Sequence, residues 1–302
     1  MTDERAPIAL FAYRRPEHLA RCLASLAANP EARQTALVIY CDGPKSAADA
    51  TLVATTRDVA HAAEGFTSVR VVASDVNRGL AASVISGVSE VLKWSDSVIV
   101  VEDDLVVSED FLAYMNQGLG LYRDEPKVVS IHGFLPRVRE ALPQSFFLRG
   151  ADCWGWATWR RGWNTFNPDG SDLLRQLRST NEVDAFNFHG AYPYLEMLER
   201  QVRGEVDSWA IRWYASAFLA GQLTLHPGAS LVTNIGMEGS GTHAGHRQGL
   251  NSTTNRMSLP LRPIPVVENA EARAAVGDAI RSSVGMRDRV VSRISRLRMR
   301  KD

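Results

Sequence analysis

The first half of the chain alternates between short apolar runs and longer segments that carry apolar residues at helical spacing. The apolar runs occupy residues 7–13, 36–41, 69–73, 97–101 and 128–132. The helical spacing recurs over residues 16–26, 46–64, 79–93 and 111–123. Runs of the first kind predict buried strands, and the second pattern predicts amphipathic helices. The alternation predicts an α/β fold, with a mostly parallel central sheet and helices on both faces.

The pattern changes after residue 134. Residues 150–170 hold Trp154, Trp156, Trp159 and Trp163 with little regular period. We expect a helix over 209–219 and a short strand over 223–226. The remaining segments are a glycine- and histidine-rich loop at 233–253 and an extended, proline-rich stretch at 255–268. The sequence therefore predicts two halves, 1–134 and 135–268, and a separate tail at 269–302.

Composition and charge narrow the class of protein. The chain has 302 residues, 45% of them hydrophobic, with 34 basic and 34 acidic side chains. This composition is ordinary for a globular protein, and the absence of a basic excess argues against nucleic-acid binding. The sequence shows no apolar leader, no transmembrane stretch and only three dispersed cysteines, which favours a cytoplasmic protein in a reducing compartment.

The C-terminal tail departs from this neutral balance. Residues 287–301 carry seven basic side chains and one acid, with Val290, Val291, Ile294 and Leu297 on one helical face. A short basic amphipathic helix is typical of a membrane-surface element. It is equally typical of a solvated C-terminal helix, and the sequence leaves the two open.

The strongest chemical signal is the acidic triplet Glu102, Asp103 and Asp104, which directly follows the apolar run 97–101. Ligands bind off the carboxyl ends of strands in open parallel sheets. Adjacent carboxylates repel one another unless a cation relieves them, and Mg²⁺ or Mn²⁺ prefers carboxylate and phosphate oxygens. The triplet therefore indicates a metal site for a nucleotide diphosphate, with an acidic turn in water as the alternative.

Further candidate residues stand at the ends of the other predicted strands. They are Ala12, Tyr13 and Arg14 after the first strand, Asp42 after the second, and Asn77, Arg78 and Gly79 after the third. Asn77 is placed to cap the next helix, whose N-terminus favours anions, and Arg78 adds a charge for a phosphate. Alone, Asp42 is typical of a turn; together, these residues indicate a nucleotide site along one sheet edge.

This series of motifs resembles the GT-A fold glycosyltransferases, specifically bacterial family-2-like enzymes and N-acetylglucosaminyltransferase I-type enzymes. The resemblance covers residues 6–245 and includes Phe-Ala-Tyr-Arg-Arg-Pro at 11–16 and Gly-Trp-Ala-Thr-Trp at 155–159. It implies a nucleotide-sugar donor, with UDP-sugar as the expected class, and a glycan or lipid-linked acceptor. It assigns Asp42 to the base, Asp104 to a Mn²⁺ or Mg²⁺ ion, and Glu102 and Asp103 to the substrate.

The resemblance extends to residues of the second half. It implies a catalytic carboxylate that deprotonates the acceptor hydroxyl with inversion at the anomeric carbon. Asp207 is the favoured base over Glu205, because a helix N-terminus helps to hold a carboxylate ionised; a helix cap is the alternative role. Trp154 or Trp156 is expected to wall the sugar site. His243 is expected to bind metal or pyrophosphate, with His246 and His226 as competitors.

Two other functions fit parts of this pattern. One is a metal-dependent sugar nucleotidyltransferase, which is disfavoured because no glycine-rich stretch follows the first strand. The other is a non-catalytic carbohydrate- or nucleotide-binding protein, which needs the tryptophans but not both Asp104 and Asp207. Metal-dependent release of the nucleotide separates these hypotheses.

Overall fold

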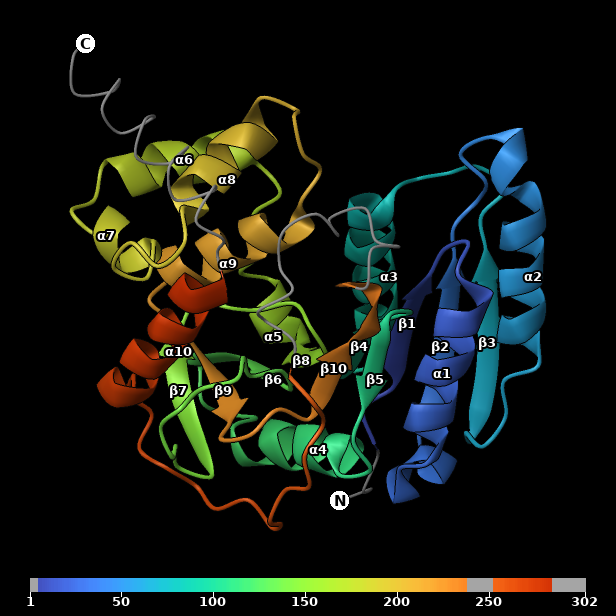
Figure 1. Cartoon of the computed structure of the whole chain (residues 1–302), viewed down its shortest axis with the longest axis horizontal. Coiled ribbons are helices and arrows are strands. Elements are labelled where there is room, and N and C mark those ends of the chain that lie inside the picture. The colour runs from blue at the N-terminus through green and yellow to red at the C-terminus, as the bar shows by residue number, and fades with distance from the viewer. Residues whose placement is uncertain (1–4, 238–251, 284–302) are drawn as a thin grey trace.

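A computed structural model of the chain describes residues 5–237 and 252–283 (Figure 1). Within them the strands are β1 Ile8–Ala12, β2 Ala36–Cys41, β3 Ser68–Ala73, β4 Ser97–Glu102, β5 Leu105–Val107, β6 Val128–His132, β7 Ser145–Arg149, β8 Trp156–Trp159, β9 Leu223–Pro227 and β10 Val232–Asn234. The α-helices are α1 Pro16–Ala27, α2 Ala50–His61, α3 Leu80–Trp94, α4 Phe111–Leu121, α5 Arg160–Trp163, α6 Gly170–Arg178, α7 Val183–Phe186, α8 Tyr194–Val202, α9 Trp209–Leu219 and α10 Ala270–Ser283.

Eight of these strands form one sheet in the order β3-β2-β1-β4-β8-β6-β9-β7. β3, β2, β1 and β4 are parallel, as are β6 and β9, whereas β8 and β7 run antiparallel to their neighbours. The chain leaves β1 for β2 on one side and later returns to place β4 on the other. The carboxyl ends of the neighbouring strands β1 and β4 are therefore the switch point at which such sheets bind ligands.

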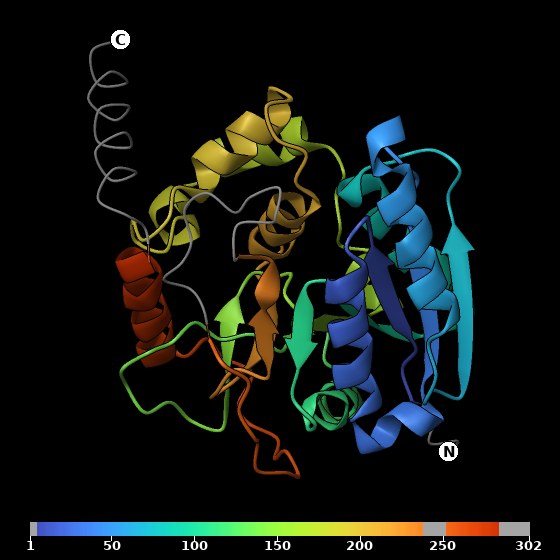
Figure 2. The same cartoon turned by 45° about the vertical axis from the view of Figure 1, so that its right-hand side comes forward.

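Helices cover both faces of the sheet, as the hydrophobic pattern predicts. Buried side chains of α1, α2 and α4 form one core with alternate strand residues such as Ile8 and Leu10. The other strand residues, including Ala9 and Phe11, pack with α3 and α9 on the opposite face. The predicted α/β class, with a largely parallel central sheet, is confirmed. Figures 1 and 2 show the β1–β3 end beside α1 and α2, and α6 to α10 grouped at the other end.

Four tryptophans form the centre of the second core. Trp156 is fully buried, and its ring centroid lies 5.5 to 5.8 Å from those of Trp163, Trp209 and Trp213. β8 is a central strand whose residues are all buried, so its sequence lacks the alternation of a half-exposed strand. Its four residues, Trp-Ala-Thr-Trp, are also too short an apolar run to predict a buried strand.

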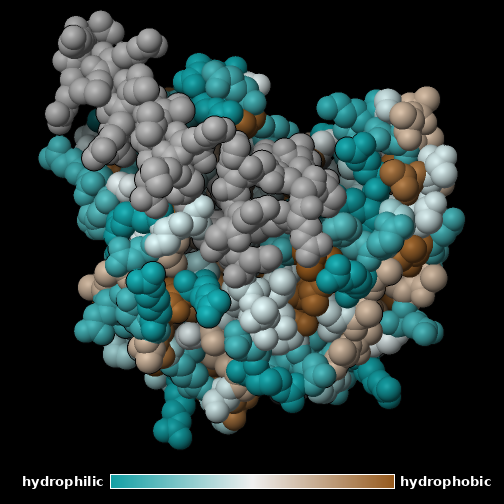
Figure 3. Space-filling model, in the orientation of Figure 1, coloured by the Kyte–Doolittle hydropathy of each residue, from teal (hydrophilic) through white to brown (hydrophobic). Residues whose placement is uncertain are grey.

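The sheet is continuous across residue 134, because β6 pairs with β8 and β9 from the second half. The two predicted halves therefore share one sheet. Their separate functions stay a prediction. Among the described residues, no helix is long and apolar enough to cross a membrane. The face seen in Figure 3 is largely hydrophilic where it is coloured, with hydrophobic residues in small groups. The basic stretch 287–301 lies outside the described residues.

Candidate functional site

The ends of β1 and β4 meet at the switch point through backbone and side-chain hydrogen bonds. The amide of Asp103 donates to the carbonyl of Phe11 at 2.9 Å, which continues the β1–β4 pairing past Glu102. The amide of Tyr13 then donates to Asp103 Oδ2 at 3.0 Å. The predicted juxtaposition of Tyr13 with the acidic triplet is therefore present, and Asp103 fixes the loop that follows β1.

Arg15, which the sequence analysis did not single out, provides the positive charge at the triplet. Its guanidinium Nη1 lies 3.0 Å from Asp104 Oδ2 and 3.8 Å from Asp103 Oδ1. Asp104 Oδ1 is buried and has no hydrogen-bond partner among the described residues. One carboxylate oxygen of Asp104 is thus paired with Arg15, and the other is buried without a hydrogen bond from the described residues.

Burial and mutual repulsion disfavour ionisation of the other two acids. Burial, followed by the neighbouring Asp104 carboxylate, raises the pKa of Asp103 to about 7. Burial and the two aspartates also raise the pKa of Glu102 well above its usual value. An added cation would reverse this effect, because it favours the charged carboxylates.

The first residues of the predicted loop at 233–253 pack on Asp104. The amide of Ile235 donates to the Asp104 carbonyl at 2.8 Å, next to the antiparallel pairing of β10 with β5. Gly236 lies so close that a methyl group at its Cα would overlap the Asp104 carboxylate. A side chain at this position would have to displace the Asp104 carboxylate. His243 and His246 lie outside the described residues, so their expected roles stay predictions.

Asp42 has a different environment from the triplet. Its buried carboxylate accepts four hydrogen bonds, from Asn77 Nδ2 and from the backbone amides of Gly43, Arg78 and Gly79, at 2.8 to 3.1 Å. A carboxylate offers about four acceptor sites, so the protein itself fills them. The carboxylate of Asp42 thus holds the turn before α3, which differs from its expected contact with a base.

The expected capping role of Asn77 is wrong for the same reason. α3 begins at Leu80 with Gly79 as the N-cap, and no side chain caps it from that position. Asp42 reaches across from the end of β2 to accept the Arg78 and Gly79 amides. Gly79 has a φ of 78°, a conformation that glycine adopts without strain.

Arg14 turns away from the triplet, in contrast to Arg15. Its Nη1 lies 2.6 Å from Asp49 Oδ1, and its side chain is 51% exposed. The Tyr13 hydroxyl donates to Asp49 Oδ2 at 3.1 Å. The Arg14 guanidinium holds the pKa of Asp49 below its usual value. Arg14 thus joins the loop after β1 to the loop after β2.

Asp207 lies at the opposite rim of this edge, beside the N-terminal end of α3. A methyl group on Gly79 would lie 3.7 Å from Asp207 Oδ2, so the carboxylate and the Asp42–Gly79 turn are neighbours. The side chain is 66% exposed, and Oδ1 lies 3.5 Å from Arg212 Nη2. The cap of α9 is Ser208, whose Oγ accepts from the Ile211 amide. Asp207 is therefore not the cap of this helix.

Glu205, the alternative base, is engaged elsewhere. Its carboxylate is 2.6 Å from Arg203 Nε and 3.2 Å from Arg200 Nε. The Arg203 hydrogen bond lowers the pKa of Glu205. No contact between Glu205 and Asp42, Asp103 or Asp104 appears among the described residues, whereas Asp207 adjoins Gly79. The geometry favours Asp207 of the two.

The two tryptophans proposed for the sugar wall have different environments. Trp156 is 0% exposed within the tryptophan cluster, so its expected contact with substrate is wrong. Trp154 is half-buried and packs edge-to-face on Phe134, with ring centroids 4.7 Å apart. Since Trp156 pairs with Val100 of β4, the residues just before Trp156 run toward the acidic end of that strand. Trp154 stays a candidate.

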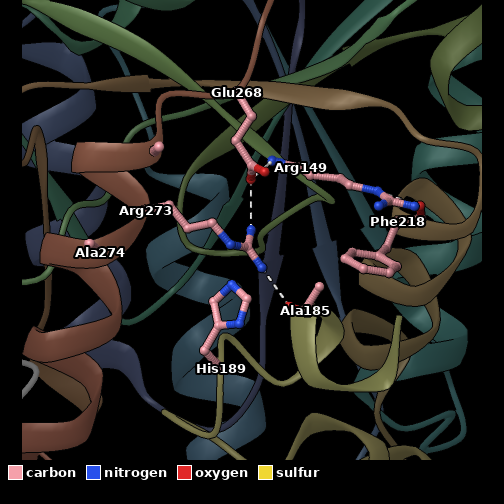
Figure 4. A pocket seen from close by; sticks show the side chains of 8 residues that line it. Arg149, Ala185, His189, Phe218, Glu268, Arg273 and Ala274 are labelled. Carbon is pink, nitrogen blue, oxygen red and sulfur yellow. Dashed lines mark hydrogen bonds and ion pairs between the residues drawn. The ribbon is translucent and has the colours of Figure 1, made fainter. Parts of the chain in front are cut away.

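A cavity of about 430 Å³ opens far from this site in the sheet, at the end of β7 (Figure 4). Its lining includes Arg149, Arg273 and Glu268. Glu182 binds Arg149 at 2.5 Å, and Glu268 binds Arg273 at 2.6 Å. Arg149 pairs with Leu223 at the start of β9, and therefore at the amino edge of that strand. The charges of this cavity are internally balanced.

Comparisons with known proteins find distant structural likenesses. No family model matches the sequence, and no curated protein does. The mannosyltransferase PcManGT from Pyrobaculum calidifontis, in complex with GDP-Man and Mn²⁺, is 12% identical with a TM-score of 0.41, over 72% of this chain and 69% of its own. S. aureus TarS is 15% identical with a TM-score of 0.31, over 49% of this chain. The matched part spans 24% of TarS.

Proposed function

We propose that this chain is a metal-dependent glycosyltransferase of the GT-A type, which transfers a sugar from a nucleotide diphosphate to a hydroxyl of a glycan or lipid-linked glycan. The observation that carries the proposal is the state of Asp104. Its Oδ1 is buried at the switch point between β1 and β4 and has no hydrogen-bond partner in the part of the chain that the structure describes; ligands of such sheets bind at this point. The resemblance in sequence motifs supports the same function.

The residues of the triplet fit a divalent cation. A buried carboxylate oxygen without a hydrogen bond is a suitable ligand for Mn²⁺ or Mg²⁺. No group of three or more histidine, cysteine or acidic side chains is arranged for a metal within residues 5–237 and 252–283. Asp104 would thus hold the ion together with phosphate oxygens of the donor. The bound ion supplies charge neutralisation for the leaving nucleotide diphosphate.

The chain's own groups account for the remaining tasks. Arg15 forms an ion pair with Asp104. Its guanidinium can bind the phosphates of the donor when they enter the site. Asp207, exposed at the rim beside Gly79, accepts the proton of the acceptor hydroxyl as that oxygen attacks the anomeric carbon. Direct displacement with one carboxylate base gives inversion. Trp154 walls the sugar site on the β4 side.

The nucleotide and the setting of the reaction are also part of this proposal. We expect a UDP-sugar from the motif resemblance, with GDP-sugars as the alternative that the PcManGT complex suggests. A hexosyl or N-acetylhexosaminyl group is the expected cargo. A cytoplasmic location, with the basic stretch 287–301 against an anionic membrane, suits a lipid-linked acceptor.

A thermal-shift panel tests the proposal most directly. The full chain is heated with UDP, GDP, CDP, dTDP and their sugars, each with Mn²⁺ and with EDTA. A ligand that binds only the folded state raises the unfolding temperature by mass action. We expect one nucleotide and its sugars to stabilise the chain only when metal is present. With an acceptor extract, we expect the chain to release the nucleotide diphosphate from that nucleotide sugar. Absence of metal-dependent stabilisation by every nucleotide would contradict the proposal.

A further inference from the structure

A second polar cluster lies at the carboxyl ends of β6 and β9 and has no task in the proposed reaction. His132 ends β6 and His226 lies in β9, with ring centroids 5.1 Å apart. Asp152 Oδ2 lies 3.3 Å from His132 Nε2. Because β6 and β9 run parallel to each other and to β4, this cluster belongs to the same sheet edge as Asp104.

His132 has an unusual environment for a buried side chain. It is 0% exposed, and neither ring nitrogen has a hydrogen-bond partner among the described residues. Burial lowers the pKa of both His132 and His226 to about 3, so both rings are neutral at pH 7. A neutral imidazole still has one donor and one acceptor. Leaving such a group unpaired in a buried position is unfavourable, which indicates a partner that is gained in another state of the protein.

Asp152 is placed to become that partner. Its Oδ2 is within reach of Nε2, but the pair does not have hydrogen-bond geometry. Its side chain is 50% exposed, and its Oδ1 accepts from the Cys153 amide at 2.8 Å. Hydrogen bonds of functional groups are often long in a free enzyme and tighten in the complex. A small rotation of the carboxylate would complete the bond to His132.

The same segment presents an aromatic surface two residues later. Trp154 packs edge-to-face on Phe134, and Phe134 in turn packs on His132 with ring centroids 6.3 Å apart. The pairing of Trp156 with Val100 directs this segment toward the end of β4. A half-exposed carboxylate and a half-buried indole thus stand beside Phe134 and His132, which are buried, at the same edge of the sheet as the candidate metal site.

We propose that Asp152 and Trp154 bind the terminal, uncharged sugar of the acceptor, and that His132 positions Asp152 for this contact. The proposal rests on the glycosyltransferase function and specifies its acceptor. An indole covers the apolar C–H face of a sugar ring, and a carboxylate accepts hydrogen bonds from sugar hydroxyls. A hexuronate would bring a second carboxylate beside Asp152. Two like charges in one binding site repel, so we expect the site to prefer an uncharged sugar.

The test uses the full chain labelled with 5-fluorotryptophan and observed by ¹⁹F NMR. Trp154→Phe assigns the Trp154 resonance. The probes are the methyl glycosides of glucose, galactose and mannose and the matching methyl glucuronide and galacturonide at equal ionic strength, with and without UDP or GDP and Mn²⁺. Trp94 is the matched control, because it is 54% exposed at the far end of α3. We expect at least one neutral glycoside to shift Trp154 and leave Trp94 unchanged.

Variants then test the two supporting residues. Asp152→Asn is expected to weaken the binding of the neutral glycoside about fivefold, the effect of one net hydrogen bond, and to reduce the discrimination against the uronide. His132→Phe is expected to weaken binding similarly, whereas His132→Gln, which retains a donor, restores most of it. Equal loss in both His132 variants would reduce that residue to packing and overturn its positioning role.

Other outcomes separate this proposal from the function on which it rests. Nucleotide binding with metal, but no Trp154 shift with any glycoside, would overturn the acceptor site and leave the glycosyltransferase function standing. Equal binding of the uronide would overturn the uncharged class. A Trp154 shift in a chain that binds no nucleotide would support the sugar site and remove the glycosyltransferase function.

Discussion

Two pairs of aspartates at the same sheet edge differ in how the protein satisfies them. Asp42 and Asp49 are held by hydrogen bonds and an arginine from neighbouring loops. Among the described residues, Asp104 keeps one buried oxygen without a hydrogen-bond partner, and Asp207 is two-thirds exposed with one arginine at 3.5 Å. The position of a carboxylate after a strand therefore does not tell its role. The number of hydrogen-bond partners separates the acids that build the loops from Asp104 and Asp207, to which the proposed function gives a ligand.

The largest expected effect concerns Asp207. Asp207→Asn keeps the shape of the side chain but cannot accept the acceptor proton, so we expect turnover to fall by about 10²–10⁴. Metal-dependent nucleotide binding should stay unchanged, as measured by thermal shift. Glu205→Gln is the matched control, because Glu205 is paired with Arg200 and Arg203. A similar loss in that control would remove the distinction between the two acids.

Asp104→Asn is the next test. We expect metal-dependent nucleotide binding to weaken on the order of 100-fold, because the amide is a poor substitute for a charged metal ligand. The free energy of unfolding should not fall in metal-free buffer, since one of three adjacent carboxylates is removed. Isothermal titration with nucleotide and Mn²⁺, and urea unfolding with EDTA, give the two quantities. Normal binding in this variant would exclude Asp104 from the metal site.

Asp42→Ala should lower the free energy of unfolding, in contrast to Asp104→Asn. Three backbone amides and Asn77 lose their acceptor, so we expect the free energy of unfolding to fall by about 2–3 kcal/mol. Asp96→Ala serves as the control, because its carboxylate is 90% exposed, and should change stability by less than about 0.5 kcal/mol. Urea unfolding measures both. If the Asp42→Ala protein were as stable as the unchanged chain but lost nucleotide binding, Asp42 would instead contact the nucleotide.

The smallest effect is a pH dependence at His132 and His226. Their pKa values are about 3 in the folded chain, below the usual value of 6.5. The unfolded chain therefore binds more protons between pH 6.5 and 3, and stability is present above pH 6.5 and lost as the pH falls. One such group loses about 2 kcal/mol between pH 6.5 and 5. Urea unfolding at both pH values should show a smaller loss for His132→Phe than for the unchanged chain.

Much of the fold follows from the hydrophobic pattern, because the parallel strands are continuous apolar runs. β2, β6 and α9 have the predicted boundaries. β7 and β8 were not predicted, because their apolar runs, 146–148 and 156–157, are too short to stand out in the sequence. The short β5 and β10 depend on pairing with each other across more than a hundred residues, which a local pattern does not encode.

The site was predictable by location but not by partner. The sequence places the acidic triplet, Tyr13 and Asp42 at one edge because carboxyl ends of parallel strands share it. Which of Arg14 and Arg15 faces the triplet depends on the backbone at Arg14, whose φ is 24°. The burial of Trp156 depends on Trp209 and Trp213, far away in sequence. Such contacts are set by tertiary packing.

The cluster of Trp156, Trp163, Trp209 and Trp213 has an optical consequence. Indole rings with centroids 5.3 to 5.8 Å apart couple electronically, so their far-ultraviolet circular dichroism should carry an exciton signal that vanishes when the core loosens. Trp209 opens α9 only two residues after Asp207. The tryptophan cluster therefore serves as an intrinsic chromophore beside the candidate catalytic residue. Changes in the packing of α9 can be measured optically without an added label.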